Sequence, residues 1–301
     1  MDQERLARIR ELLGEGEAAL VESRQRGGSA GQRGSRFEDL VAIRELALAI
    51  RELDESEVDW IAQAQATGFV DDFVRYSHQQ GCFIACQAKA VARLRWRDVE
   101  SAFRNERRML ESEGWRDIRL RLIISHAALV ALLRAECPNG LVVEVAHQPW
   151  AEQGISELAG NAQWADPIRW LMSREWAPER AVAVCAQAML GIWVGQGQGQ
   201  SVRVSDYWRQ LRAAVPAGLL RSSGQHHELA QEICALLTRL PALRCTISRG
   251  WLHWEYGDTD RGTVPHAIDS HHFGLLAARW RQTPPQSFDD VELELCGGSV
   301  S

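Results

Sequence analysis

Hydrophobic residues at helical spacing mark two helices at the start of the chain. Residues 2–24 fit a charged amphipathic helix. The Gly/Ser-rich stretch 26–34 reads as a linker, because a phosphate loop would need a strand before it and Gly-Lys-Ser after it. A second helix is expected over residues 36–51, with Ser35 as its N-cap and Glu38 at the capping-box spacing.

Strand patterns dominate the region after this second helix. Alternating or continuous apolar runs predict four strands, at residues 58–66, 69–76, 82–90 and 118–125. Two helical patterns separate or follow the later strands, at residues 98–113 and 127–135. The order helix, strands, helix, strand, helix predicts an α/β core.

The region from residue 149 to 301 is less regular, and its pattern is mainly helical. Helices near 206–215 and 227–240 precede an expected β-hairpin of residues 244–248 and 251–256. Helices followed by a hairpin hint at a winged-helix-like module, but contact with a partner protein or clamping of a substrate suits the acidic residues of the second helix better. We expect the tail, residues 289–294, to form a short acidic strand or a disordered end.

Composition narrows the function classes. The formal net charge of −6 argues against nonspecific coating of nucleic acid. Locally, residues 89–121 hold ten cations against six acids, so this segment could meet phosphates or form a solvated helix face. Seven cysteines without a CxxC pair suggest free thiols in a reducing cytoplasm. No apolar run is long enough to cross a bilayer, so we expect no membrane association.

Lys89 is the only lysine among 34 basic residues. A chain that uses arginine everywhere else keeps one compact ammonium, a group that a guanidinium cannot replace in geometry or hydration. Gln87 shares a strand face with it, because side chains alternate along a strand. A turn of four residues before residue 82 would place Asp72 opposite Gln87, whereas a turn of five residues would place Asp71 there.

Such a group has a chemical meaning. A carboxylate, an amide oxygen and the backbone carbonyl between Gln87 and Lys89 form a set of hard oxygen ligands suited to Mg²⁺ or Mn²⁺. The neighbouring ammonium can position a water or neutralise charge that develops on a phosphate. These are the parts needed for metal-assisted phosphodiester hydrolysis. Glu38 stands at the capping-box position of the predicted helix, and capping is the role that this position indicates by itself.

The order of these motifs resembles the PD-(D/E)xK nuclease superfamily in its Gln-x-Lys branch. The resemblance spans about residues 31–135 and rests on these segments: Phe37-Glu38, Asp71-Asp72, Gln87-Ala88-Lys89, Trp96-Arg97-Asp98-Val99 and Leu122-Ile123-Ile124-Ser125. It is similar to the double-strand DNA nuclease domain of bacterial anti-phage systems, which occurs fused to sensors or paired with HerA- or SMC-like ATPases.

The resemblance implies a restriction-endonuclease-like core, a mixed sheet flanked by helices, within residues 31–148. It implies catalytic roles for Glu38, Asp72, Gln87 and Lys89, with Glu38, Gln87 and Asp72 or Asp71 as metal ligands. The implied substrate is double-stranded DNA, contacted by the arginines that follow the lysine: Arg93, Arg95 and Arg97.

The implied activity is that of a cytoplasmic defence endonuclease, controlled by a separate ATPase or sensor subunit or by formation of homo-oligomers. The alternative is a catalytically silent nuclease fold that serves as a protein- or DNA-binding scaffold. Retention of the single lysine favours catalysis.

Overall fold

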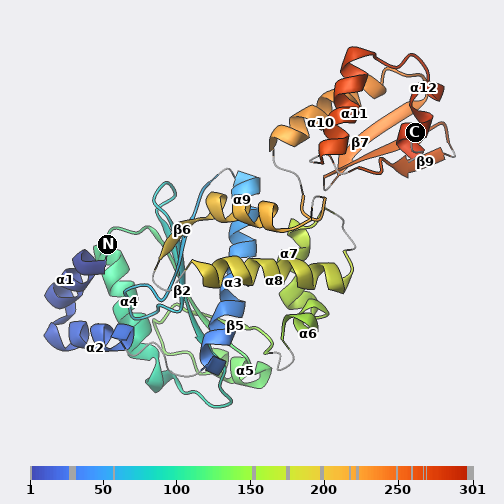
Figure 1. Cartoon of the computed structure of the whole chain (residues 1–301). Coiled ribbons are helices and arrows are strands. Elements are labelled where there is room, and N and C mark those ends of the chain that lie inside the picture. The colour runs from blue at the N-terminus through green and yellow to red at the C-terminus, as the bar shows by residue number, and fades with distance from the viewer. Residues whose placement is uncertain are drawn as a thin grey trace. The chain divides into compact units, whose positions relative to one another are not determined.

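The computed structural model describes residues 2–26, 32–56, 58–150, 154–173, 177–196, 200–216, 218–221, 224–248, 250–258, 260–266, 268 and 270–296. The chain divides into two compact units, which are treated separately below (Figure 1). The first comprises residues 1–168 and 183–211, and the second comprises residues 169–182 and 212–301. Among the described helices, none combines the length and the hydropathy that a bilayer span requires.

A mixed sheet of six strands forms the centre of the first unit. The strand order is β5-β4-β3-β2-β1-β6. Strands β3, β4 and β5 are parallel to one another, whereas β2, β1 and β6 join antiparallel. The strand bounds are β1 Ile61–Ala64, β2 Phe73–Ser77, β3 Cys82–Lys89, β4 Asp117–Ile124, β5 Glu144–His147 and β6 Ser201–Arg203.

Two helices connect the parallel strands and cover one face of the sheet. Helix α4, Glu100–Ser112, follows the short 3₁₀ turn Trp96–Asp98, and helix α5, Ala127–Ala135, leads from β4 to β5. Alternate residues of the strands pack with these helices into one apolar core. Its fully buried members include Ala85, Phe103, Leu110, Leu122, Ile124 and Leu133. The expected α/β order with a mixed, helix-flanked sheet is therefore confirmed.

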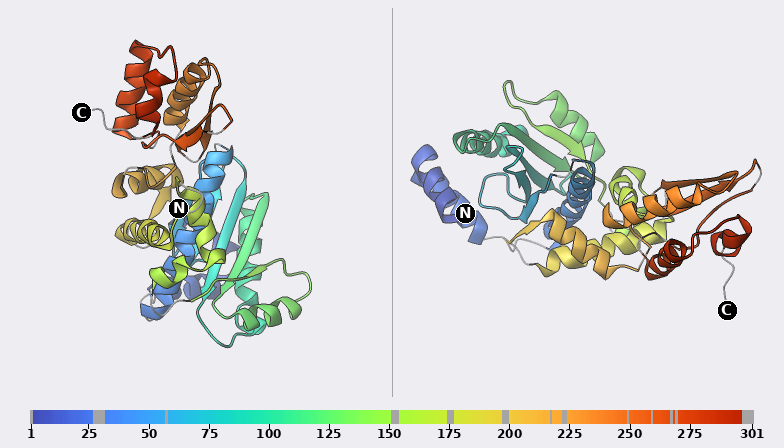
Figure 2. Two further views of the ribbon diagram at one scale, coloured as in Figure 1. Left: turned by 90° about the vertical axis from the view of Figure 1, so that its right-hand side faces the viewer. Right: turned by 90° about the horizontal axis from the view of Figure 1, so that it is seen from above.

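Helix α3, Gln32–Ser56, packs on the opposite face of the same sheet (Figure 2). Its Glu45 contacts Arg75 of β2 and Arg121 of β4, which alternate with the residues of the apolar core. The two faces of the sheet therefore differ in chemistry: one is apolar, and the other holds buried charges. This helix starts earlier than the sequence predicts, so Ser35 lies inside it and does not cap it.

The N-terminal segment forms two helices where the sequence predicts one. Helix α1, Asp2–Leu13, and helix α2, Glu15–Arg26, are separated by Gly14 at φ +95°. This left-handed conformation suits glycine and ends a helix, which the apolar spacing on both sides does not reveal. Most of the predicted linker, residues 27–31, lies outside the described part of the chain.

The strands before the turn are shorter than expected. Residues 69–72 precede β2 as an irregular segment, and β1 occupies only the centre of the expected 58–66 strand. The cause for the former is a long-range contact: the backbone N–H groups of Phe69 and Val70 donate to the Glu106 carboxylate at 2.7 and 3.4 Å, and not to a neighbouring strand. Helix α5 and strands β3 and β4 lie within one residue of their predicted bounds, whereas strand β5 was not predicted.

Residues beyond 149 also contribute to the first unit. Its later helices are α6 Ile155–Ala159, α7 Ala162–Leu171, α8 Glu179–Gly195 and α9 Val204–Ala214, of which α7, α8 and α9 extend into the second unit. Strand β6 pairs with β1, and the Asp59 carboxylate accepts hydrogen bonds from the backbone and hydroxyl of Ser205 at 3.1 and 2.7 Å. The sheet thus includes a segment that the sequence places in the second region.

The second unit contains a three-stranded antiparallel sheet with helices. Its elements are α10 Gly224–Leu237, β7 Leu243–Ser248, β8 Trp251–Tyr256, β9 Asp260–Thr263, α11 His271–Gln282 and α12 Asp289–Cys296. The predicted hairpin is present as β7 and β8, but the region does not end there: β9 and two helices follow. The acidic tail, expected as a strand or disordered end, is helix α12, whose Val291 and Leu295 are buried in the core of this unit.

Candidate active site

The turn between β2 and β3 decides which aspartate meets Gln87. Ser77 pairs with Cys82, so four residues form the turn, and Phe73 pairs with Cys86 at the other end of β2. Continuing that register by one residue places Asp72 beside Gln87. Of the two alternatives that the sequence leaves open, the structure shows the one with Asp72.

Asp72 lies one residue before β2 begins, beside the C-terminal end of β3. Its Oδ2 accepts hydrogen bonds from the Gln87 side-chain amide and from the backbone N–H of Ala88, the latter at 2.7 Å. The Lys89 ammonium lies 3.9 Å from the same oxygen. These contacts hold the carboxylate against the end of β3, and Lys89 keeps a third of its side chain exposed to solvent.

Glu38 of helix α3 completes the group. Burial and, after it, the nearby Asp72 charge raise the pKa of Glu38 from 4.5 to about 7, against the opposing effect of the Lys89 ammonium. The side chains of Glu38, Asp72, Gln87 and Lys89 therefore come together and are called the sheet-end cluster below. Burial also raises the pKa of the adjacent Asp39.

Gln65 belongs to this site, although nothing in the sequence singles it out. Its side chain hydrogen-bonds to the Glu38 carboxylate and lowers the pKa of that group. Its backbone has φ +46°, a left-handed conformation that non-glycine residues adopt at a cost of about 1–3 kcal/mol. Its backbone N–H also donates to the Asp72 carbonyl at 3.4 Å. A glutamine after a strand carries no sequence signal for this strained conformation.

The segment that leads to Asp72 is held in place by a buried ion pair between Glu106 and Arg5. Glu106 of α4 is fully buried, accepts from the backbone of Phe69 and Val70, and pairs with Arg5 of α1 at 2.8 Å. Burial raises the pKa of Glu106, and Arg5 counteracts this. Gly68 fits closely here, since a Cβ atom at that position would lie 2.8 Å from a Glu106 carboxylate oxygen.

The three candidate DNA-contacting arginines follow the cluster directly. Arg93, Arg95 and Arg97 are exposed in the segment between β3 and α4. The Arg97 guanidinium lies 3.8 Å from Asp98, a solvent-exposed pair, and the Arg95 backbone N–H donates to the same carboxylate. These arginines are not part of the sheet-end cluster, but they follow Lys89 within eight residues of sequence and are exposed to solvent.

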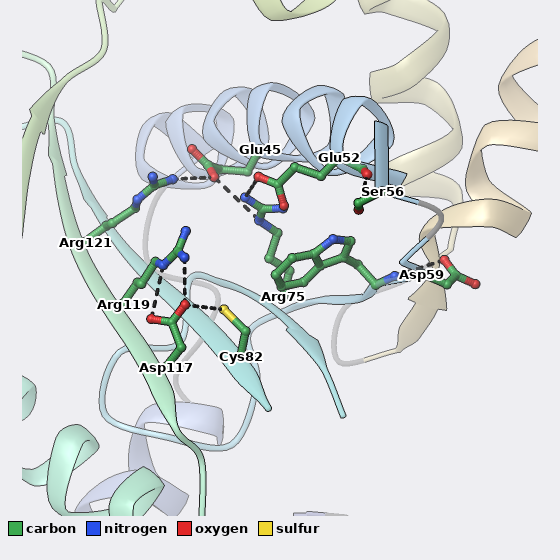
Figure 3. A network of polar contacts seen from close by, with 10 residues as sticks. Glu45, Glu52, Ser56, Asp59, Arg75, Cys82, Asp117, Arg119 and Arg121 are labelled. Carbon is green, nitrogen blue, oxygen red and sulfur yellow. Dashed lines mark hydrogen bonds and ion pairs between the residues drawn. The ribbon is translucent and has the colours of Figure 1, made fainter. Parts of the chain in front are cut away.

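On the same helix as Glu38, Glu45 lies in a different environment (Figure 3). Its side chain is 1% exposed and contacts Arg121 at 2.8 Å, Arg44 at 3.2 Å and Arg75 at 4.0 Å. Arg75 also forms two hydrogen bonds to Glu52, and Arg121 pairs with Glu144. We call Glu45, Arg44, Arg75, Arg121, Glu52 and Glu144 the buried ion network, because its centre, Glu45 and Arg75, is buried, while Glu52 and Glu144 reach solvent.

The donor set of the sheet-end cluster fits a hard cation. It offers two carboxylates, the Gln87 amide and the Ala88 carbonyl, and Mg²⁺ typically takes one or two carboxylates together with water and phosphate oxygens. Glu38 and Asp72 together carry one negative charge more than Lys89 balances when both are ionised, so a cation there relieves their repulsion. Within the described residues, no three or more His, Cys, Asp or Glu side chains lie together as a metal site, so a cation at the sheet-end cluster would rely on two carboxylates with the Gln87 and Ala88 oxygens.

The cysteines whose side chains the structure describes offer no competing site. Cys82, Cys86, Cys137, Cys185, Cys234 and Cys245 are free thiols. Burial raises the pKa of Cys82 to about 11 and of Cys185 to about 12, which keeps both protonated and unreactive at neutral pH.

Comparison with known proteins gives no assignment to a family: no protein-family model, curated protein or solved structure matches this chain. The functional argument therefore rests on the geometry of the sheet-end cluster.

Proposed function

We propose that the chain is a metal-dependent endonuclease that hydrolyses phosphodiester bonds in double-stranded DNA. The observation that carries this proposal is the convergence of Glu38, Asp72 and Lys89 at one end of a mixed α/β sheet. Three segments far apart in the sequence supply one carboxylate, a second carboxylate and the only lysine. The fold and the motif order support the proposal through the resemblance to Gln-x-Lys nucleases.

Each residue has a role in this reading. Glu38, Asp72 and the Gln87 and Ala88 oxygens would hold Mg²⁺ or Mn²⁺, which supplies Lewis-acid activation of the phosphate and of a water. The Lys89 ammonium would orient the attacking water or stabilise negative charge on the phosphate oxygens. Gln65 keeps the Glu38 carboxylate in place through its hydrogen bond. Arg93, Arg95 and Arg97 would contact backbone phosphates, which sets position and not sequence.

The raised pKa of Glu38 makes metal binding at this site depend on pH. Near neutral pH the carboxyl group is partly protonated, and only the ionised form is a metal ligand. Metal binding and DNA cleavage are therefore expected to strengthen as the pH rises through about 7. As a biological setting we propose an effector of a bacterial anti-phage system, activated by a separate ATPase or sensor subunit or by oligomerisation.

The test is cleavage of covalently closed plasmid and of linear double-stranded DNA with Mg²⁺ or Mn²⁺, because only an endonuclease cuts the closed circle. We expect Lys89→Ala and Asp72→Ala to lower the rate by about 10²–10³-fold, as loss of a charge-stabilising group does in other active sites. Asp71→Ala is the matched control for Asp72→Ala and should keep most of the activity. Circular dichroism checks that each variant is folded.

Two outcomes would count against this proposal. Cleavage that survives in Lys89→Ala comes from a contaminant or from another site. A wild-type protein that binds neither Mn²⁺ nor Mg²⁺ in calorimetry, and that stays inactive with the product of a neighbouring ATPase gene, is the catalytically silent scaffold.

A further inference from the structure

A cavity of about 490 Å³ lies in the first unit. It is bordered by α1, by the β2–β3 turn at residues 78–81, and by residues 113–116 after α4. The turn joins the ends of β2 and β3 that are opposite to Asp72 and Lys89, so about 20 Å of strand separates this end of the cavity from the sheet-end cluster. The inner wall, with Ala66, Thr67 and Val74, extends toward the cluster, but none of Glu38, Asp72, Gln87 and Lys89 lines the cavity. The volume falls within the range of about 300–1,000 Å³ that is usual for small-molecule sites.

One wall of the cavity is aromatic. Tyr76 and Phe83 stack on each other with ring centroids 5.7 Å apart, and both are buried. The rings of His78 and Trp115 lie over them and stack at 4.9 Å with an interplanar angle of 25°. Because His78 is exposed and Trp115 is half-buried, these two rings offer planar surface to a ligand.

The rim of the cavity carries uncompensated cations. Arg8 of α1 and Arg116 before β4 are both exposed, and neither forms an ion pair within the described part of the chain. Arg5 also lines the cavity but is already committed to Glu106 and Glu113. Glu113 is in turn held by the Trp115 indole at 3.1 Å, which leaves Glu4 as the other acid on the lining.

We propose that this cavity binds a mononucleotide, with its base stacked on the Trp115–His78 surface and its phosphate groups bound by Arg8 and Arg116. Planar stacking and guanidinium forks are the two contacts that nucleotides make most often with such side chains. A simple anion would not need the aromatic wall, and an apolar ligand would not need the two arginines. This inference does not depend on the endonuclease proposal.

Calorimetric titration of the full chain with ATP and with AMP, both without metal, tests the proposal. Adenosine and inorganic phosphate are titrated separately, because each presents half of the ligand. The variants are Arg8→Glu, Arg116→Glu and Trp115→Leu; both arginines are exposed, so their replacement leaves the apolar core unchanged. Arg108→Glu is the matched control, since Arg108 is an exposed arginine of α4 that does not line the cavity.

We expect ATP to bind wild type and Arg108→Glu equally, and Arg8→Glu or Arg116→Glu at least tenfold more weakly. Trp115→Leu should weaken adenosine binding and leave phosphate binding unchanged, while Asp72→Asn should bind ATP as wild type does.

Failure of both nucleotides to bind overturns the proposal, and so does equal binding of phosphate and ATP. Loss of binding in Asp72→Asn would move the ligand to the sheet-end cluster, and binding of oligonucleotides without mononucleotides would also reject the site.

Discussion

Helix α3 presents two glutamates to the same side of one sheet, and they have opposite environments. Glu38 and Glu45 are seven residues apart, which is close to two helical turns. Around Glu45, carboxylates and guanidiniums alternate and balance in charge. Around Glu38, a second carboxylate faces it and only one ammonium compensates. A balanced buried network stabilises the fold, whereas an unbalanced group at the end of a sheet is suited to binding a cation.

The largest expected effect separates the two glutamates directly. Glu45→Gln should lower the free energy of unfolding by about 3 kcal/mol, the lower end of the range for breaking a buried ion pair. We expect the lower end because, after Glu45 is replaced, Arg75 still pairs with Glu52 and Arg121 still pairs with Glu144. Glu38→Gln, the same substitution on the same helix, should cost no stability at pH 8. Urea unfolding of both variants measures this, and equal losses would remove the distinction between the two sites.

The next effect concerns the segment that positions Asp72. Gly68→Ala should lower the free energy of unfolding by about 1–3 kcal/mol, because the new Cβ lies 2.8 Å from Glu106 Oε2 and must push it away. Gly191→Ala is the control: no atom lies within 4 Å of its added Cβ, and alanine inside helix α8 should be neutral or stabilising.

Thermal unfolding compares these two alanine variants. If Glu106 and Arg5 hold the loop of Asp72 as we infer, Gly68→Ala also weakens metal binding at the sheet-end cluster. Unchanged metal affinity in a destabilised Gly68→Ala protein would show that the loop position does not control the cluster.

The last effect is the pH dependence that Glu38 contributes. Its pKa is about 7 in the folded chain and 4.5 as the ordinary value, so the folded state favours the protonated form. This contribution to stability is complete below pH 4.5 and is lost as the pH rises through about 7. Glu38→Gln should remove that slope, so its melting temperature should exceed that of the wild type at pH 8.

Magnesium sharpens this last comparison. A cation that binds the ionised cluster should raise the melting temperature of the wild type at pH 8 and have less effect on Glu38→Gln. Parallel pH curves for the two proteins, with no response to magnesium, would show that Glu38 titrates without linkage to folding or to a metal.

The elements with local signals were predictable from the sequence. Alternating residues define β3 and β4, and the apolar run of residues 127–135 is helix α5. Those patterns also bring Gln87 and Lys89 to one face. The choice between Asp71 and Asp72 was not predictable, because it depends on a difference of one residue in turn length.

Long-range contacts explain what the sequence did not reveal. The Glu106 carboxylate accepts hydrogen bonds from the backbone N–H groups of Phe69 and Val70, which in a longer β2 would bond to a neighbouring strand. Glu106 lies 37 residues after Phe69 in the sequence. Strand β6 pairs with β1 across more than a hundred residues of chain, and its three residues carry no strong strand pattern. The positive φ of Gln65 also results from packing at the end of the sheet and not from its own side chain.

The lone lysine has a practical consequence. Reagents that acylate or methylate primary amines can modify only one side chain in this protein, and that side chain lies 3.9 Å from Asp72 and is partly open to solvent. Reductive methylation with isotope-labelled formaldehyde would therefore place a single side-chain probe inside the sheet-end cluster. Its magnetic resonance signal would report ligand arrival and proton loss at that point, without any mutation elsewhere in the chain.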